Sequence, residues 1–150
     1  MMIDSIEKHM ITDKEQIAWR FDSDIEILEK IDILDKEFSD RLWNKLINDK
    51  IVDKFSLFEN KFKKFEEKHF DNNYNWITNR LKELSKLDDR VLITWSDGIV
   101  LETIYKNFID NWELFYNPSA DDLFVINNES DWIICLTHFE LFQCGQKLMK

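Results

Sequence analysis

The sequence predicts a single α+β domain over residues 1–150, mainly helical in 1–90 and strand-rich in 91–150. We expect about four mostly antiparallel strands, within residues 91–145, to form a sheet that packs against the N-terminal helices. Three observations lead to this fold class. Apolar residues recur every three or four positions in the first part, which is typical of amphipathic helices. The second part holds short β-branched and aromatic runs between turns. No Gly-, Ser- or Pro-rich linker separates the two parts.

The helices are expected in the first part of the chain. Residues 1–22 are ambiguous between a short helix and an edge strand. Ser23 or Asp24 can then cap a helix whose apolar residues recur at spacings of four, three and four. Three more apolar stripes predict further helical runs before residue 90. The four stripes are Ile27, Ile31, Leu34 and Phe38; Leu42, Trp43, Leu46 and Ile47; Phe58, Phe62 and Phe65; and Trp76, Ile77, Leu81 and Leu84.

The strands are expected in the second part, together with one helix. Four apolar or aromatic runs predict strands, and short loops join the last three, which makes these three antiparallel neighbours. An amphipathic pattern from Ile99 to Trp112 predicts a helix that ends before Pro118, because proline stops helices. The four predicted strands are 91–95, 123–126, 132–136 and 140–144.

The two cysteines and the ends of the chain indicate a compartment. Cys135 and Cys144 are expected on neighbouring strands at different depths, which disfavours a disulfide and favours buried free thiols. The N-terminus lacks a basic segment followed by an apolar run, and no stretch approaches 18 uncharged apolar residues. We therefore expect a cytoplasmic protein without a membrane span.

The charge is strongly biased. The chain has 20 Lys+Arg against 30 Asp+Glu, a net charge of -10, which argues against a nucleic-acid partner. Residues 107–146 contain no Lys or Arg. Two interpretations are open: a surface that keeps the protein soluble, or a docking face for a cationic partner. The acids of this window are Asp110, Glu113, Asp121, Asp122, Glu129, Asp131 and Glu140.

Catalytic motifs are absent from the sequence. There is no G-x-S-x-G, P-loop or dinucleotide fingerprint. His138 and Glu140 form the H-x-E pair seen in zinc deaminases, but the C-x-x-C that completes such a site is missing. Asp121 and Asp122 follow the turn at Pro118 and are expected to act as a turn cap rather than as a metal or proton-transfer pair. We therefore expect no enzymatic activity, no cofactor and no metal.

A C-terminal segment carries a resemblance. An aromatic residue and Pro-Ser, two acids, a strand, a tryptophan and H-x-E before a glycine follow one another in 112–122, Trp132 and 138–145. This arrangement resembles small uncharacterised bacterial proteins. Some of them are similar to immunity partners of secreted bacterial toxins, or to the wider family related to yeast cell-wall regulators. The resemblance implies a binding function and supplies no catalytic residues.

These observations predict a non-enzymatic protein-binding module, specifically a cytoplasmic immunity protein whose acidic face occludes the active site of a basic toxin such as a nuclease. The alternatives are an adaptor or regulatory scaffold of the cell-wall-regulator type, an enzyme or metal-binding protein centred on His138 and Glu140, and a mimic of nucleic-acid charge. Neither nucleic acid nor a membrane is an expected partner. The expected partner contacts are Glu113, Asp121, Asp122, Glu129 and Asp131, with Tyr116 as an aromatic anchor.

Overall fold

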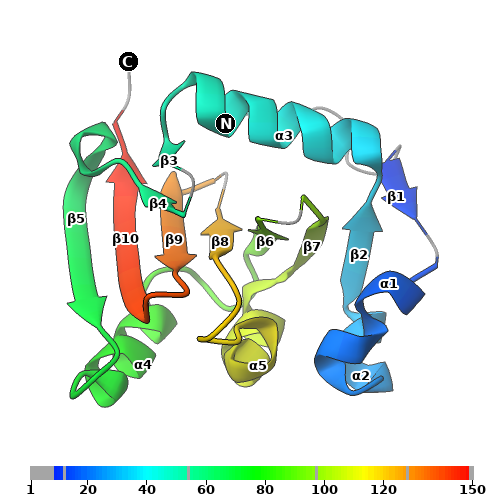
Figure 1. Ribbon diagram of the computed structural model, residues 1–150. Helices are drawn as coiled ribbons and strands as arrows, with labels where there is room; N and C mark the ends of the chain where they lie inside the picture. The colour runs from blue at the N-terminus through cyan, green and yellow to red at the C-terminus, as the bar shows by residue number, and fades with distance from the viewer. Residues whose placement is uncertain (1–8, 12, 54, 97, 128, 149–150) are drawn as a thin grey trace.

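A computed structural model describes residues 9–148, apart from residues 12, 54, 97 and 128, and shows an α+β architecture (Figure 1). Its main feature is an eight-stranded sheet in which every neighbouring pair is antiparallel. In spatial order the strands are β1 (Met10–Ile11), β2 (Ile31–Leu34), β7 (Val100–Ile104), β6 (Arg90–Trp95), β8 (Leu123–Ile126), β9 (Trp132–Leu136), β10 (Leu141–Lys147) and β5 (Phe62–His69).

Helices cover both faces of this sheet. The long helix α3 (Lys36–Asn48) lies across the top in Figure 1, together with a small hairpin of β3 (Val52–Asp53) and β4 (Ser56–Leu57). The remaining helices lie below. They are α1 (Glu15–Ala18), η2 (Trp19–Phe21), α2 (Ile25–Glu29), α4 (Tyr74–Glu83) and α5 (Tyr105–Phe115), and a short turn, η3 (Glu59–Lys61), precedes β5. None of the helices in the described residues is long and apolar enough to cross a membrane.

The central strands contribute to two hydrophobic cores at once. In β6, Val91 and Ile93 pack with α4 and α5, whereas Leu92 packs with α3. In β8, Val125 likewise packs on the α4 and α5 side, whereas Phe124 packs on the α3 side. Successive side chains of a strand point to opposite faces, so a strand buried on both faces needs a continuous apolar run. This explains why these strands are recognisable in the sequence.

The α+β class is confirmed, but the expected four-stranded sheet built from residues 91–145 is wrong. Strands β1, β2 and β5 come from the first half of the chain, which was expected to be mainly helical. Strand β7 occupies the start of the segment that was expected to be a helix from Ile99 to Trp112, and α5 begins only at Tyr105. The sheet is therefore twice as wide as predicted, and helices cover it on both sides.

A β-bulge explains why β5 has a helix-like sequence pattern. Gln146 of β10 pairs with Lys63 and Cys144 pairs with Glu66, so two residues of β5 lie opposite Gly145 alone. Lys64 in this bulge has a φ of 54°. The extra residue shifts the alternation of the strand, and Phe62 and Phe65 join the same core although they are three positions apart. A spacing of three is usually a helical signal.

Cys135 and Cys144 are buried free thiols on the neighbouring strands β9 and β10. They belong to different cores, because Cys135 packs with the α3 side and Cys144 with the α4 and α5 side. Burial raises the pKa of Cys144 to about 12 and raises the pKa of Cys135 as well. Both thiols therefore stay protonated, which makes them poor nucleophiles.

The start of α3 gives the first testable prediction. Asp35 caps the helix, since its Oδ1 accepts a hydrogen bond of 2.9 Å from the backbone N of Phe38, and His9 Nδ1 lies 3.0 Å from the same oxygen. The Phe38 bond, followed by the interactions with His9, lowers the pKa of Asp35 below its usual 3.8. A depressed carboxyl pKa stabilises the fold above pH 3.8, and that stabilisation is lost as the pH falls through the folded-state pKa.

Asp35→Asn keeps a capping side chain but removes the charge. We expect this variant to unfold at lower urea concentration than the wild type at neutral pH. The two midpoints should converge as the pH falls through the folded-state pKa of Asp35, because the wild type loses its charge there. The prediction would be contradicted if the urea midpoints of the variant and the wild type differed by the same amount at neutral pH and below the folded-state pKa of Asp35.

Candidate functional site

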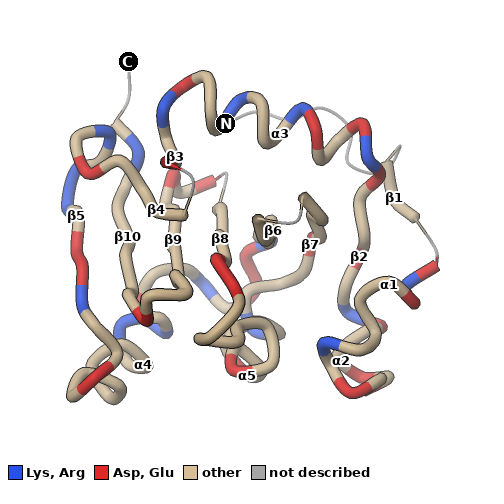
Figure 2. The backbone as a smooth tube through the Cα atoms, viewed as in Figure 1, with Lys and Arg blue, Asp and Glu red and all other residues tan. Residues whose placement is uncertain are grey.

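The six residues predicted to contact a partner do not form one face of the molecule. Asp121 and Asp122 precede β8, whereas Glu129 and Asp131 follow it, so the two pairs lie at opposite ends of that strand. Figure 2 shows acidic positions on the chain at both ends of β8. Glu113 and Tyr116 lie at the C-terminal end of α5. A continuous acidic face made of all six residues is therefore not formed.

Asp121 is buried and neutralised by a base from the first half of the chain. Its Oδ2 lies 3.0 Å from Nη1 of Arg20, and it also accepts a hydrogen bond of 2.8 Å from the backbone N of Asn117. Arg20 in turn lies 4.2 Å from the centre of the Trp95 ring. The expectation that the second half of the chain carries uncompensated carboxylates is wrong for Asp121, whose ion pair fastens η2 to the turn before β8.

Asp122 is also buried, and it orients His138. Its Oδ1 lies 2.8 Å from His138 Nδ1 and accepts a bond of 2.9 Å from the backbone N of the same residue. Such an Asp–His pair resembles part of a catalytic triad. Within the described part of the chain, no hydroxyl or thiol is hydrogen-bonded to the ring. The one group of side chains there that is close enough to share a metal ion is His9, Asp35 and Glu37, without His138 or Glu140.

Around His138 lies what we call the aromatic ridge: Phe55, His138 and Phe139. Phe55 is in the turn between β3 and β4, and its ring meets the His138 ring edge-on at 5.1 Å. The Phe139 ring lies 3.9 Å from His138. Phe55 is 42% and Phe139 59% exposed. Exposed aromatic side chains in contact with one another are typical of protein-binding surfaces.

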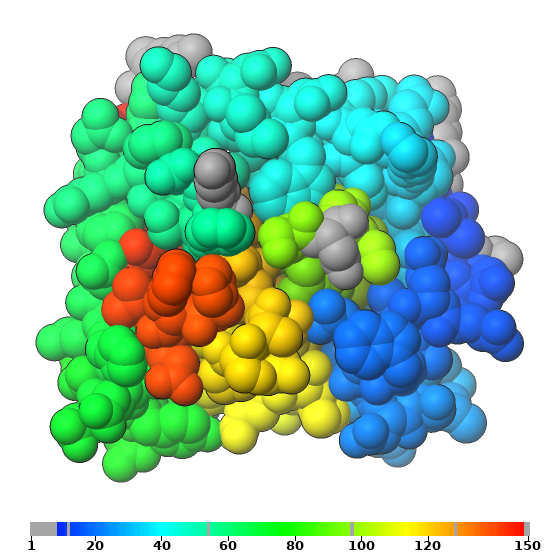
Figure 3. Space-filling view, viewed as in Figure 1, coloured from blue at the N-terminus to red at the C-terminus, as the bar shows by residue number. Residues whose placement is uncertain are grey.

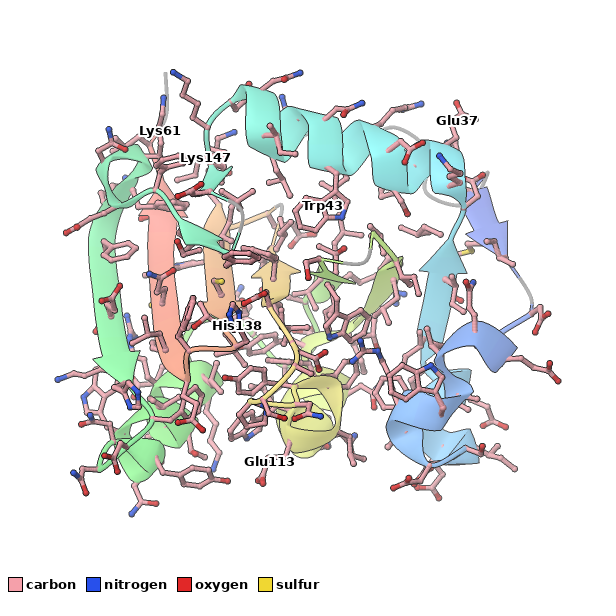
Figure 4. The ribbon with its side chains drawn as sticks, viewed as in Figure 1. Glu37, Trp43, Lys61, Glu113, His138 and Lys147 are labelled. Carbon is pink, nitrogen blue, oxygen red and sulfur yellow. The ribbon has the colours of Figure 1, made fainter. Side chains whose placement is uncertain are left out.

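Next to the ridge is an apolar groove of about 600 Å³ between α3 and the β3–β4 hairpin. Ile47 and Phe58 are its most exposed apolar residues. Its floor is rigid, because Trp43 donates a hydrogen bond of 3.0 Å to Thr94 Oγ1 and packs edge-on against Phe124. Figure 4 shows Trp43 above His138 and Glu113 below it. The lining residues are Trp43, Ile47, Lys50, Val52, Asp53, Phe58 and Ser96.

On the other side of the ridge is a smaller cavity of about 230 Å³, which we call the acidic pocket. Phe70 stacks on Trp112 and Tyr116 at ring distances of 5.9 and 5.6 Å. The hydroxyl of Tyr74 donates a hydrogen bond of 2.6 Å to Glu113 Oε1. The lining residues are Phe70, Tyr74, Trp112, Glu113, Tyr116, Pro118 and Glu140. Of the predicted contacts, Glu113 and Tyr116 are thus brought together.

The acidic pocket has a negative electrostatic environment. Burial raises the pKa of Tyr116, and the nearby carboxylates Glu140, Asp122 and Asp121 raise it further. The bond to Glu113 raises the pKa of Tyr74. Among the residues that the structure describes, no Lys or Arg forms an ion pair with Glu113 or Glu140.

Several residues of this surface were missed by the sequence reasoning. Trp43, Ile47 and Phe58 belong to apolar stripes that predicted buried helix faces, and their partial exposure is a property of the folded surface. Phe139 offered a weak signal, because it is an aromatic residue in the turn that separates two strands. Figure 3 shows this turn (orange) beside residues 117–120 (yellow) on one face.

Comparison of the sequence with protein-family models and with curated proteins finds no match in either case. We therefore infer the function from the chemistry of the surface residues. The groove, the aromatic ridge and the acidic pocket contain residues that are close to one another in sequence. Phe55 lies between groove residues Asp53 and Phe58, and Phe139 precedes Glu140 of the pocket.

Proposed function

We propose that this protein is a non-enzymatic binding protein that docks a basic protein partner on the groove, the aromatic ridge and the acidic pocket. The observation that carries the proposal is the clustering of exposed apolar side chains beside a preformed groove: Ile47, Phe55, Phe58 and Phe139. Large rigid side chains of this kind provide most of the binding energy in protein interfaces.

The sign of the partner's charge follows from the surroundings. The protein has a net charge of -10, and Glu113 and Glu140 line the pocket at one end of the surface. Opposite charge on a partner raises the association rate and selects against acidic competitors. Glu113 and Glu140, which are exposed, are therefore proposed as contacts in place of the buried Asp121 and Asp122. Tyr116, the predicted aromatic anchor, is itself only 3% exposed and contributes to the wall of the pocket. Glu129 and Asp131 stay predicted contacts at a separate end of β8.

The biological setting that we propose is toxin immunity in the cytoplasm, where the protein would cover the basic active site of a toxin domain. The support for this setting is the C-terminal resemblance described above together with the acidic charge. An adaptor or regulatory scaffold is the second candidate, because the same surface suits any basic protein. Growth separates the two: an immunity protein restores growth to cells that express its partner, whereas an adaptor does not.

The proposal is tested by comparing what two variants capture from the native cell. Phe55→Ala/Phe139→Ala removes the two phenylalanines of the ridge, and both side chains are exposed, so the fold should persist. Leu87→Ala, also an exposed apolar truncation, is the matched control away from this surface. We expect a basic protein to bind the wild type and the control, and to bind the ridge variant at least about 30-fold more weakly.

Measurement of the affinity of each purified variant for the captured protein, followed by a growth-rescue assay, completes this test. Equal affinity of the ridge variant and the wild type would overturn the proposed surface. A captured partner whose interaction surface is acidic would overturn the proposed charge complementarity.

A further inference from the structure

We propose that the acidic pocket is a binding site for one alkylammonium or guanidinium group, the head of a lysine or arginine side chain inserted by the partner. The inference rests on the proposed function in naming a protein as the source of this cation. It concerns a single pocket and a single functional group, and it can be tested without the partner.

The size and the walls of the pocket suit such a side chain. Its volume of about 230 Å³ is below the roughly 300 to 1,000 Å³ that drug-sized ligands occupy. Phe70, Tyr74, Trp112 and Tyr116 line it with aromatic carbon. Lysine and arginine have apolar stems that bury against such walls while the charged head keeps polar contacts. An aromatic neighbour also attracts the cation electrostatically.

Two acidic residues, Glu113 and Glu140, line the pocket. Glu113 is oriented by the hydrogen bond of 2.6 Å from Tyr74, which uses Oε1 and leaves Oε2 to accept another donor. Glu140 is held by its backbone: its N donates to Thr137 O at 3.0 Å, and its O accepts from Phe70 N at 2.8 Å. The last bond ties the backbone of the Glu140 turn to Phe70 in the aromatic wall.

The cations of the flanking elements have other partners. Lys68 on β5 lies 5.0 Å from the ring centre of Trp76, and Arg80 on α4 pairs with Glu66 at 2.6 Å. Neither forms an ion pair with Glu113 or Glu140. The pocket thus combines aromatic walls with two carboxylates that have no ion pair to a base of the described chain, and an external organic cation complements both.

The test is an NMR titration of the full chain with n-butylammonium, n-propylguanidinium and tetramethylammonium, with n-butanol as the neutral probe. The first two mimic lysine and arginine, and the third represents a quaternary amine. We expect the first two to shift the signals of Trp112, Tyr116 and Phe70 in a saturable way. In Glu113→Gln/Glu140→Gln the affinity should fall about tenfold, since two exposed charge contacts are lost.

Glu59→Gln is the control, because it removes one exposed negative charge in η3, outside the pocket. Its affinity should be close to that of the wild type. Three outcomes would overturn the inference: no saturable shift at the pocket with butylammonium or propylguanidinium, an equal response to n-butanol, or unchanged binding in the double variant. Tetramethylammonium binding more tightly than either would also overturn it, in favour of a quaternary amine.

These outcomes are distinguishable from a failure of the proposed function. If the ridge variant loses its partner while the pocket binds no cation, the docking surface holds and the pocket inference is wrong. If the pocket binds the cations but no basic protein depends on the ridge, the docking proposal is wrong and the chemistry of the pocket holds.

Discussion

Asp121→Ala is expected to lower the free energy of unfolding by about 3 to 5 kcal/mol, the largest effect of any single substitution considered for this protein. Arg20 and Asp121 have side chains that are only 8% and 9% exposed. In this variant the buried guanidinium of Arg20 loses the Asp121 carboxylate as a partner. The backbone N of Asn117 also loses its side-chain hydrogen-bond acceptor. Urea unfolding of the purified variant measures the effect.

Two controls show whether burial of the charge is the cause. Arg20→Met/Asp121→Leu removes both charges and should recover much of the loss, because a buried ion pair is often replaceable by apolar residues. Glu129→Ala, an exposed acid in the same half of the chain, should change stability by less than about 0.5 kcal/mol. If Asp121→Ala were as stable as the wild type and only partner binding suffered, Asp121 would be a contact residue after all.

Gly145→Ala is expected to destabilise the protein by about 1 to 3 kcal/mol, although it adds a single methyl group. A Cβ at this position would lie 2.7 Å from Cβ and 2.9 Å from Cγ of Phe62. Phe62 is buried, and Gly145 lies opposite the bulge of β5 in a strand that is paired on both sides. Neither strand can move away without breaking backbone hydrogen bonds.

Thermal and urea unfolding of Gly145→Ala and Gly145→Val measure this clash, and the valine variant should be the less stable of the two. Gln146→Ala, a truncation at the next position of β10, is the control and should cost less than either. If all three variants unfolded at the same urea concentration, the close approach of Phe62 would not constrain this position.

The sequence predicted those strands that are buried on both faces and missed those whose pattern depends on distant partners. Residues 91–95, 123–126 and 132–136 were predicted as strands and lie in β6, β8 and β9. Glu102 and Thr103 lie in β7, within the segment from Ile99 to Trp112 that was predicted to be a helix. They are instead satisfied in the sheet, Glu102 by Arg90 at 2.7 Å and Thr103 by the backbone O of Lys30 at 2.6 Å.

The structure of the stripe from Ile27 to Phe38 also depends on partners that are distant in sequence. Its helical spacing runs through α2, β2 and α3, and the strand between the two helices exists because Ile31 and Ile33 pair with β7. Pairing of segments that are about 70 residues apart along the chain is a tertiary effect, which overrides local propensity. By contrast, the Asp24 cap of α2 was predictable, because it depends on the neighbouring residue Ile27 only.

The candidate site was predictable only where its residues are close in sequence. Glu113 and Tyr116 were expected to act together and lie on one helical turn at the end of α5. Phe70 and Glu140 reach the same pocket because β5 pairs with β10. Asp121 was misjudged for the same reason, since its partner Arg20 is 101 positions away.

The bulge in β5 also bears on self-association. This strand forms one border of the sheet, where unpaired backbone groups invite another chain to add a strand. Lys63, Lys64 and Lys68 are exposed along it, and Figure 2 shows basic positions on this border. A β-bulge and a row of exposed lysines are features that disfavour the addition of another strand to a sheet edge, so this border is poorly suited to pair with a second copy of the chain.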